Sequence, residues 1–117
     1  MRREVQMLFM VQIEFQFPHT MPQAERDDLI RRETEASVAF LRSGREIRPW
    51  RVAGKAASIS LWDFDTLEEL DAALKSLPIF PWFTRLEITP LIEHPSLRAY
   101  KAQYGAPPDL DGRRAEG

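Results

Sequence analysis

The 117-residue chain contains no cysteine, and this absence removes three kinds of chemistry. Without a thiol there is no disulfide framework, no thiolate metal ligand and no cysteine nucleophile. The absence also fits a reducing compartment. Long hydrophobic runs are missing as well, since no apolar stretch of the sequence is long enough to span a bilayer. We therefore expect no membrane partner.

Neither sign of charge predominates. Sixteen Lys and Arg face 18 Asp and Glu, which gives a formal net charge of −2, and the two signs are interspersed. This composition predicts no binding surface for nucleic acid or for an anionic membrane. The N-terminal segment MRREVQ is basic but no signal-type apolar core follows it, so we expect no signal peptide and a cytoplasmic location.

The length and a hydrophobic content of 44% suit one globular domain. We expect that domain to cover residues 7–96. Residues 1–6 are interpreted as an N-terminal extension, because Met7 would serve equally well as a start. After His94 and Pro95 the chain becomes polar, so residues 97–117 are predicted to be a C-terminal extension, partly disordered or docked on a neighbouring subunit.

Hydrophobic periodicity predicts four strands and two helices in the order β-α-β-β-α-β. Strict alternation from about Val5 to Phe17 is the strongest strand signal, and Pro22 and Gly44 bracket the first helix. Thr66 opens the second helix, which continues in a leucine stripe. The predicted strands cover residues 5–17, 48–53, 57–62 and 84–92. The predicted helices cover residues 22–42 and the segment from 66 to Pro78, and a short helical piece is expected at 96–103. The leucine stripe of the second helix consists of Leu67, Leu70, Leu74 and Leu77.

This order is typical of a ferredoxin-like α+β fold, in which two helices cover one face of a four-stranded antiparallel sheet. The other face would remain half apolar, and we expect it to be covered by sheet-to-sheet dimerisation in a homo-oligomer. RNA binding is another use of this fold. It needs paired aromatic motifs with basic flanks, and the strand AASISLWD does not carry them.

One carboxylate falls on the apolar side of the first helix. With Leu29 at zero on a helical wheel, Glu33 lies near 40° and Phe40 near 20° at about 100° per residue. A buried Glu with a raised pKa would suit a general base near neutral pH. Alternatively, Glu33 reaches a surface or interface partner such as Arg26 or Arg32. Spacing alone favours this second interpretation, because Glu is rarely buried unpaired.

Few other groups suggest chemistry. His19 and His94 follow the first and fourth strands, at opposite ends of an antiparallel pair, and no metal site is expected. Each histidine is either a turn residue or a catalytic group. Trp50 and Arg51 present an apolar wall and a cation to a small carboxylate, or else pack on the surface of an edge strand. We find no glycine-rich phosphate loop and no paired catalytic carboxylates in the sequence.

Five segments carry a resemblance. MLFMVQIEF, PHTMP, RRETEASVAFLRSGREIRPWRVAG, LKSLPIFPW and ITPLIEHPS occur in this order between Met7 and about Ser96. Together they resemble the muconolactone Δ-isomerase family. The resemblance implies a dimeric α+β barrel assembled into a larger ring, a decamer in this family, with no metal or organic cofactor. It also implies a small-molecule lactone as substrate and sites in the clefts between subunits.

The reaction implied by the resemblance belongs to aromatic-compound catabolism. A base removes the γ-hydrogen of an unsaturated lactone acid, and a proton returns at the α-carbon to give the enol-lactone of 3-oxoadipate. The family's glutamate on the first helix falls on Glu33, which reverses the preference stated above and makes Glu33 the expected base. By resemblance Ser37, Trp50, Arg51 and His19 line the pocket, with Arg51 binding the substrate carboxylate.

Two positions depart from the family pattern. A usual lysine is replaced by Ile30 and a common tyrosine by Ala36. The pocket becomes more apolar, which would raise the pKa of Glu33 further and weaken the hold on an anionic lactone unless Arg31 or Arg26 compensates. Two alternatives therefore stay open: a non-catalytic ligand-binding or assembly protein, and a different small-molecule enzyme on the same barrel, such as a dehalogenase or a monooxygenase-like relative.

Overall fold

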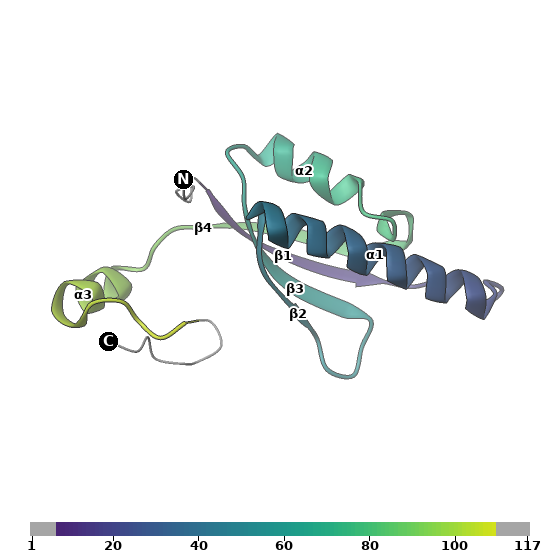
Figure 1. Ribbon diagram of the computed structural model, residues 1–117, viewed down its shortest axis with the longest axis horizontal. Helices are drawn as coiled ribbons and strands as arrows, with labels where there is room; N and C mark the ends of the chain where they lie inside the picture. Colours follow the sequence, from purple (N-terminus) through teal and green to yellow (C-terminus); the bar gives the residue numbers. More distant parts are fainter. Residues whose placement is uncertain (1–6, 110–117) are drawn as a thin grey trace.

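The computed structural model describes residues 7–109 and folds them into a sheet covered on one face by two helices (Figure 1). The elements are β1 (Leu8–Phe15), α1 (Gln23–Ser43), β2 (Glu46–Arg51), β3 (Ala57–Asp63), α2 (Leu67–Lys75), the short 3₁₀ helix η1 (Phe80–Trp82), β4 (Phe83–Leu91) and α3 (Pro95–Tyr104). This confirms the predicted α+β class and its βαββαβ order, followed by one further helix.

The four strands are antiparallel and lie in the order β2-β3-β1-β4. β1 is central, and Leu8 at its start lies opposite Asp63 of β3 and Leu91 of β4. β2 and β4 form the two edges of the sheet. Pro49 lies in β2 and Pro90 in β4. A proline has no N–H to donate to a neighbouring strand, so it is tolerated in an edge strand, which has a neighbour on one side alone.

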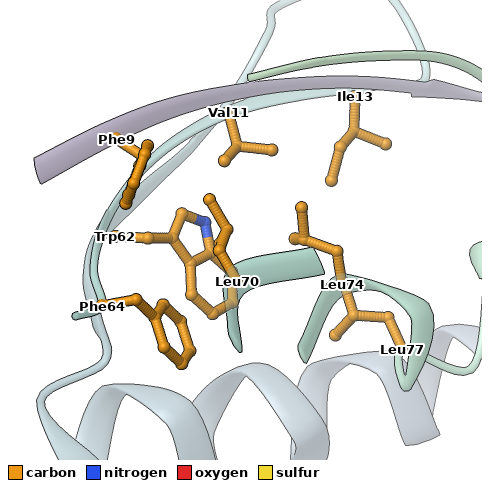
Figure 2. Packing of buried hydrophobic residues seen from close by; sticks show 8 residues of the cluster. All are labelled: Phe9, Val11, Ile13, Trp62, Phe64, Leu70, Leu74 and Leu77. Atoms are coloured by element: carbon orange, nitrogen blue, oxygen red, sulfur yellow. The ribbon is translucent and has the colours of Figure 1, made fainter. Parts of the chain in front are cut away.

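The alternation in β1 places one row of side chains in the core. Phe9, Val11 and Ile13 are buried and point toward the helical layer, as Figure 2 shows. They pack against two aromatic side chains from the end of β3 and three leucines from α2 and the segment after it: Trp62, Phe64, Leu70, Leu74 and Leu77. The core is therefore built where the central strand faces α2.

The predicted leucine stripe of α2 is only partly correct. Thr66 caps the helix by accepting a hydrogen bond from the Glu69 amide. Leu70 and Leu74 are completely buried, but Leu67 is 50% exposed. It is the first residue of the helix, and side chains lean toward the N-terminal end, so Leu67 extends past the packed layer.

Helix α1 is held to the rest of the protein at two places. Near its start Leu29 packs with Met21 and Ile79 in a second buried cluster. Near its end the Phe40 ring packs edge-to-face on Trp62, with 5.2 Å between ring centroids. Leu29 is the only buried residue of this 21-residue helix. Between the two anchors the small Ala36 packs against the core cluster, and the rest of this stretch leaves space open above the sheet.

Helix α3 confirms the short helical piece predicted for 96–103. It follows β4 and lies away from the two packed layers (Figure 1), and none of its residues is buried. The predicted N-terminal extension, residues 1–6, lies outside the described residues, as does the last part of the C-terminal extension, residues 110–117. Within residues 7–109 no helix is long and apolar enough to cross a membrane.

Two leucines of α2 give a matched test of this core. We expect Leu74→Ala to lower the free energy of unfolding by about 2–5 kcal/mol, because it removes a completely buried side chain. Leu67→Ala makes the same change at an exposed position of the same helix and should cost less than about 1 kcal/mol. Urea unfolding followed by circular dichroism measures both. Equal losses would contradict the packing described here.

Candidate active site

A cavity of about 890 Å³ lies between α1 and the β2–β3 hairpin, in the space that the two anchors of α1 leave open. Its volume falls within the range of about 300–1,000 Å³ that is common for small-molecule sites. Most of its wall is apolar, with Ile13, Phe15, Ile30, Val38 and Ile79 among the lining side chains. Four charged residues also line it: Glu33, Glu46, Arg51 and Lys55.

Glu33 enters this cavity from α1, between the anchors at Leu29 and Phe40. Its Oε1 accepts a hydrogen bond of 3.0 Å from the backbone N–H of Ile79. Ile79 is buried, so this bond joins the helix to the segment after α2. Burial raises the pKa of Glu33 above its ordinary value, and the Ile79 hydrogen bond opposes part of that rise. Glu33 thus has the environment of a general base.

The two arginines considered as surface partners of Glu33 are bound elsewhere. Arg32 pairs with Asp28 at 3.0 Å. Arg26 donates to the backbone carbonyls of Pro18 and Met21, at 2.7 and 3.1 Å. The interpretation in which Glu33 reaches one of them is therefore wrong. Neither Arg26 nor the exposed Arg31, which pairs with Asp28 and Glu35, is among the cavity-lining residues.

A second carboxylate lies in the same cavity. Glu46 begins β2 and is only 5% exposed, and its Oε1 accepts a short hydrogen bond of 2.6 Å from the Ser37 hydroxyl. Burial raises the pKa of Glu46, the Ser37 hydrogen bond lowers it, and the nearby charge of Glu33 raises it further. Ser37 follows Glu33 by one helical turn, so the three side chains form one connected group.

Glu46 was not among the predicted site residues, because the second strand was predicted at 48–53 whereas β2 begins at Glu46. A bulge in β2 also changes the direction of its side chain. The pairing shifts between Glu46, opposite Trp62, and Arg48, opposite Leu61. In an uninterrupted strand Glu46 would share a face with Arg48 and Trp50. The bulge turns it to the opposite face, toward α1. A charged residue beside a bulge is the signal that would have marked it.

The other predicted site residues divide into two groups. Ser37, Trp50 and Arg51 line the cavity with Glu33, whereas His19 is exposed on the loop after β1 and is not among the lining residues. The role of His19 in substrate binding stays a prediction.

The two neighbours on β2 contribute to the cavity differently. Arg51 lies opposite Ser58, on the sheet face that carries α1. Trp50 lies opposite Ile59, on the other face, so its contribution to the wall comes from the edge of the strand.

Charge is distributed along the cavity. Glu46 starts β2 and Arg51 ends it, so their backbones are separated by roughly 16 Å at about 3.3 Å per residue. Lys55 is 3.5 Å from Glu14 and is partly engaged there. Within residues 7–109 no acidic side chain forms an ion pair with Arg51, and no cluster of three or more His, Asp or Glu side chains is arranged to hold a metal ion. The cavity thus offers carboxylates at one end and a cation at the other.

Comparison with known proteins gives the family. A family model described as muconolactone delta-isomerase matches residues 7–97. The chain belongs to the muconolactone Δ-isomerase family. It is 36% identical over 90 residues to the muconolactone Delta-isomerase of Cupriavidus pinatubonensis, a match that covers 77% of this chain and 97% of that protein. These findings confirm the predicted family and its class, an isomerase.

Solved structures agree with this assignment. A crystal structure of muconolactone isomerase matches with a TM-score of 0.72 and 34% identity, over 77% of this chain and 93% of the other. The 5-chloro-2-hydroxyhydroquinone dehydrochlorinase of Burkholderia phenoliruptrix matches with a TM-score of 0.55 and 14% identity, over 77% and 97% of the two chains. The second likeness shows a shared fold and nothing more.

The buried Glu46 carboxylate should make stability depend on pH. Its pKa is raised in the folded protein, so folding favours the protonated form, and stability falls as the pH rises from the unfolded value of about 4.5 through the folded value. We expect Glu46→Gln to melt at a higher temperature than the wild type at about pH 8, with the difference shrinking toward about pH 5.

The control for this prediction is Glu35→Gln, which neutralises an exposed carboxylate on α1 that pairs with Arg31. Exposed pairs contribute only about 0–1 kcal/mol, so this variant should show no comparable pH-dependent gain. Thermal unfolding by scanning calorimetry measures both variants. A Glu46→Gln protein that melts below the wild type at every pH would contradict the unfavourable burial of this charge.

Proposed function

We propose that this protein catalyses the isomerisation of muconolactone, or of a closely related unsaturated lactone, to the enol-lactone of 3-oxoadipate in aromatic-compound catabolism, with Glu33 as general base. The observation that carries the proposal is the position of Glu33: half-buried in a cavity of ligand size and fixed by the Ile79 N–H. Family membership supplies the reaction class.

The first chemical step uses the Glu33 carboxylate. It accepts the γ-hydrogen of the lactone as a proton, and the electron pair of the broken C–H bond delocalises through the ring into the lactone carbonyl. Return of a proton to the α-carbon completes the isomerisation. The Ile79 N–H binds Oε1 of Glu33, which leaves Oε2 for the proton. The raised pKa makes this carboxylate a better proton acceptor than an exposed one.

Substrate binding is assigned to the other end of the cavity. Arg51 binds the side-chain carboxylate of the lactone, and the apolar wall, with Trp50 at its edge, encloses the ring. Ile30 lines this cavity, so the exchange of the family's usual lysine for Ile30 affects the site directly. Ala36 instead packs against the core cluster. The more apolar wall supports a larger or less charged lactone as the alternative substrate.

Assembly is part of the proposal. The sheet face away from the helices carries Met10 opposite Leu61 and Trp50 opposite Ile59, and none of the helices within residues 7–109 covers it (Figure 1). We assign this face to a dimeric α+β barrel, from which the decamer implied by the family would be built in the cytoplasm. The residues after 96 are assigned to a contact with a neighbouring subunit, since α3 buries none of its residues against its own chain.

The role of Glu33 is tested by Glu33→Gln. We expect kcat for muconolactone to fall by about 10²-fold or more, because the amide cannot accept the proton but still accepts the Ile79 hydrogen bond. The conversion is followed by its change in ultraviolet absorbance. Glu35→Gln, on the exposed side of the same helix, should retain wild-type kcat.

Two other results would refute parts of the proposal. An active Glu33→Gln variant would exclude Glu33 as the base. A wild-type protein that binds muconolactone without converting it would favour the alternative, a non-catalytic ligand-binding protein on the same barrel. Turnover only with chlorinated lactones would indicate the dehalogenase alternative.

The role of Arg51 is tested by Arg51→Gln. Loss of a charge-assisted hydrogen bond to the substrate should raise KM by roughly tenfold or more and change kcat little. Arg31→Gln removes a cation that is exposed and already paired on α1, so it should leave KM unchanged. Steady-state kinetics with muconolactone measure both. An unchanged KM in Arg51→Gln would place the substrate carboxylate elsewhere.

A further inference from the structure

Glu46 lines the same cavity as Glu33 but has no part in the mechanism above. Burying a carboxylate as an anion is unfavourable unless a cation or several donors compensate. Here the described contact is one hydrogen bond, from the Ser37 hydroxyl to Oε1 at 2.6 Å. The second oxygen, Oε2, remains for a proton. The cavity thus contains, in addition to the proposed base Glu33, a second carboxyl group, that of Glu46, whose burial favours its protonated form.

The charged groups around Glu46 favour its protonated form. From α1 it is faced by Glu33. From β3 it is faced by Trp62, its register partner, and by the neighbouring Ser60, neither of which is charged. On its own strand, Arg48 pairs with Leu61 on the other face of the sheet.

The cavity's two cations lie farther along the wall from Glu46. Arg51 is at the opposite end of β2, and Lys55 follows in the hairpin, where it lies 3.5 Å from Glu14. Arg45 precedes Glu46, but its guanidinium lies over the Phe64 ring, 4.9 Å from the ring centroid. The charge that raises the pKa of Glu46 is that of Glu33, and two interacting carboxylates in a partly buried site do not both ionise readily.

We propose that Glu46 is the acid partner of Glu33: Glu33 takes the proton from the γ-carbon, and Glu46 delivers a proton to the α-carbon. This inference rests on the proposed isomerase function and adds a second catalytic residue to it. The assignment of the two roles follows exposure: Glu46 is buried whereas Glu33 is only half-buried, and burial favours the protonated form of a carboxyl group.

The cycle balances without any other reactant. The γ-C–H bond breaks and an O–H bond forms on Glu33, while the electron pair moves into the lactone carbonyl to give a dienolate. The O–H bond of Glu46 then breaks and a C–H bond forms at the α-carbon. Glu33 is left protonated and Glu46 ionised, so the pair still carries one negative charge. A proton passing back from Glu33 to Glu46 restores the starting state.

Ser37 supports the ionised half of this cycle. It lies one turn along α1 from Glu33, and its hydroxyl donates a hydrogen bond to Oε1 of Glu46. The proton that returns from Glu33 goes to the other oxygen, Oε2, so Ser37 keeps its hydrogen bond throughout. Its hydrogen bond also stabilises the ionised form that Glu46 adopts after giving up its proton.

The first experiment follows hydrogen in a single turnover of muconolactone in heavy water. A one-base mechanism carries the substrate's own hydrogen from the γ- to the α-carbon, whereas an acid in exchange with solvent delivers deuterium. We expect the wild-type product to carry deuterium at the α-carbon. Glu46→Gln should lose about 10²-fold in kcat with KM little changed, and its residual product should retain more of the substrate hydrogen.

The pH profile separates catalysis from a structural role. The wild type should lose activity on the basic side as Glu46 gives up its proton, and Glu46→Gln should lack this basic limb. Ser37→Ala removes the hydrogen bond that lowers the pKa of Glu46, so its basic limb should move to higher pH. A Glu46→Gln enzyme with wild-type kcat and an unchanged pH profile would overturn the proposal.

Carbon-13 NMR titration of the glutamate carboxyls tests the pair without substrate. In the wild type the pKa of the Glu46 carboxyl should lie above its ordinary value, and Glu33→Gln should lower that pKa by removing the neighbouring charge. An ordinary titration of Glu46 overturns the acid role even if the enzyme is active. If Glu46 titrates as expected but muconolactone is not converted, the proposed substrate fails and the proton-sharing pair stands.

Discussion

The hydrogen bond between the Ile79 amide and Glu33 is the contact on which the rest of the site depends. It joins two residues 46 positions apart in the sequence, and it does so beside a buried cluster formed by Met21, Leu29 and Ile79. The same short segment after α2 therefore completes the packing under α1 and fixes the proposed base. Because the large apolar side chains of α1 pack near its two ends, at Leu29 and Phe40, the carboxylate between them keeps access to a cavity rather than being enclosed in the core.

Local patterns in the sequence predicted most of the fold. Alternation in β1 placed Phe9, Val11 and Ile13 in the core, and Gly44 ends α1 with the positive φ of 81° that glycine tolerates. The helical wheel identified Glu33 as a carboxylate on the core side. Its partner, the Ile79 amide, could not be predicted, because no local rule specifies a contact between a helix and a loop that follows the second helix.

Departures from the predictions have physical causes that act over longer distances. Leu67 fits the leucine stripe but lies at the first residue of α2, where there is no layer to pack against. Glu46 was missed because the second strand was predicted to begin at 48, whereas β2 begins at Glu46 and a bulge turns that side chain toward α1. The resemblance supplied the reaction and the importance of Arg51 and Ser37. It did not indicate that Ser37 would be bonded to a second carboxylate.

The site combines features that oppose stability with features that suit proton transfer. Burial raises the pKa of both Glu33 and Glu46, the Glu33 charge raises that of Glu46 further, and the hydrogen bonds from Ile79 and Ser37 oppose part of this rise. Ile30 and Arg51 line the same cavity, and under the proposed function the uncharged Ile30 leaves Arg51 to bind an anionic substrate. Substrate preference and base strength would then be set by different parts of one cavity.

Helix α3 has a different kind of consequence. The match to the family ends at Leu97, early in this helix, and none of the residues of α3 is buried. The two-layer body thus reaches a complete hydrophobic core before α3 begins. A segment attached in this way experiences weak selection from folding, so its sequence is free to diverge. Members of one enzyme family can therefore change their subunit contacts through such a segment without changing the active site.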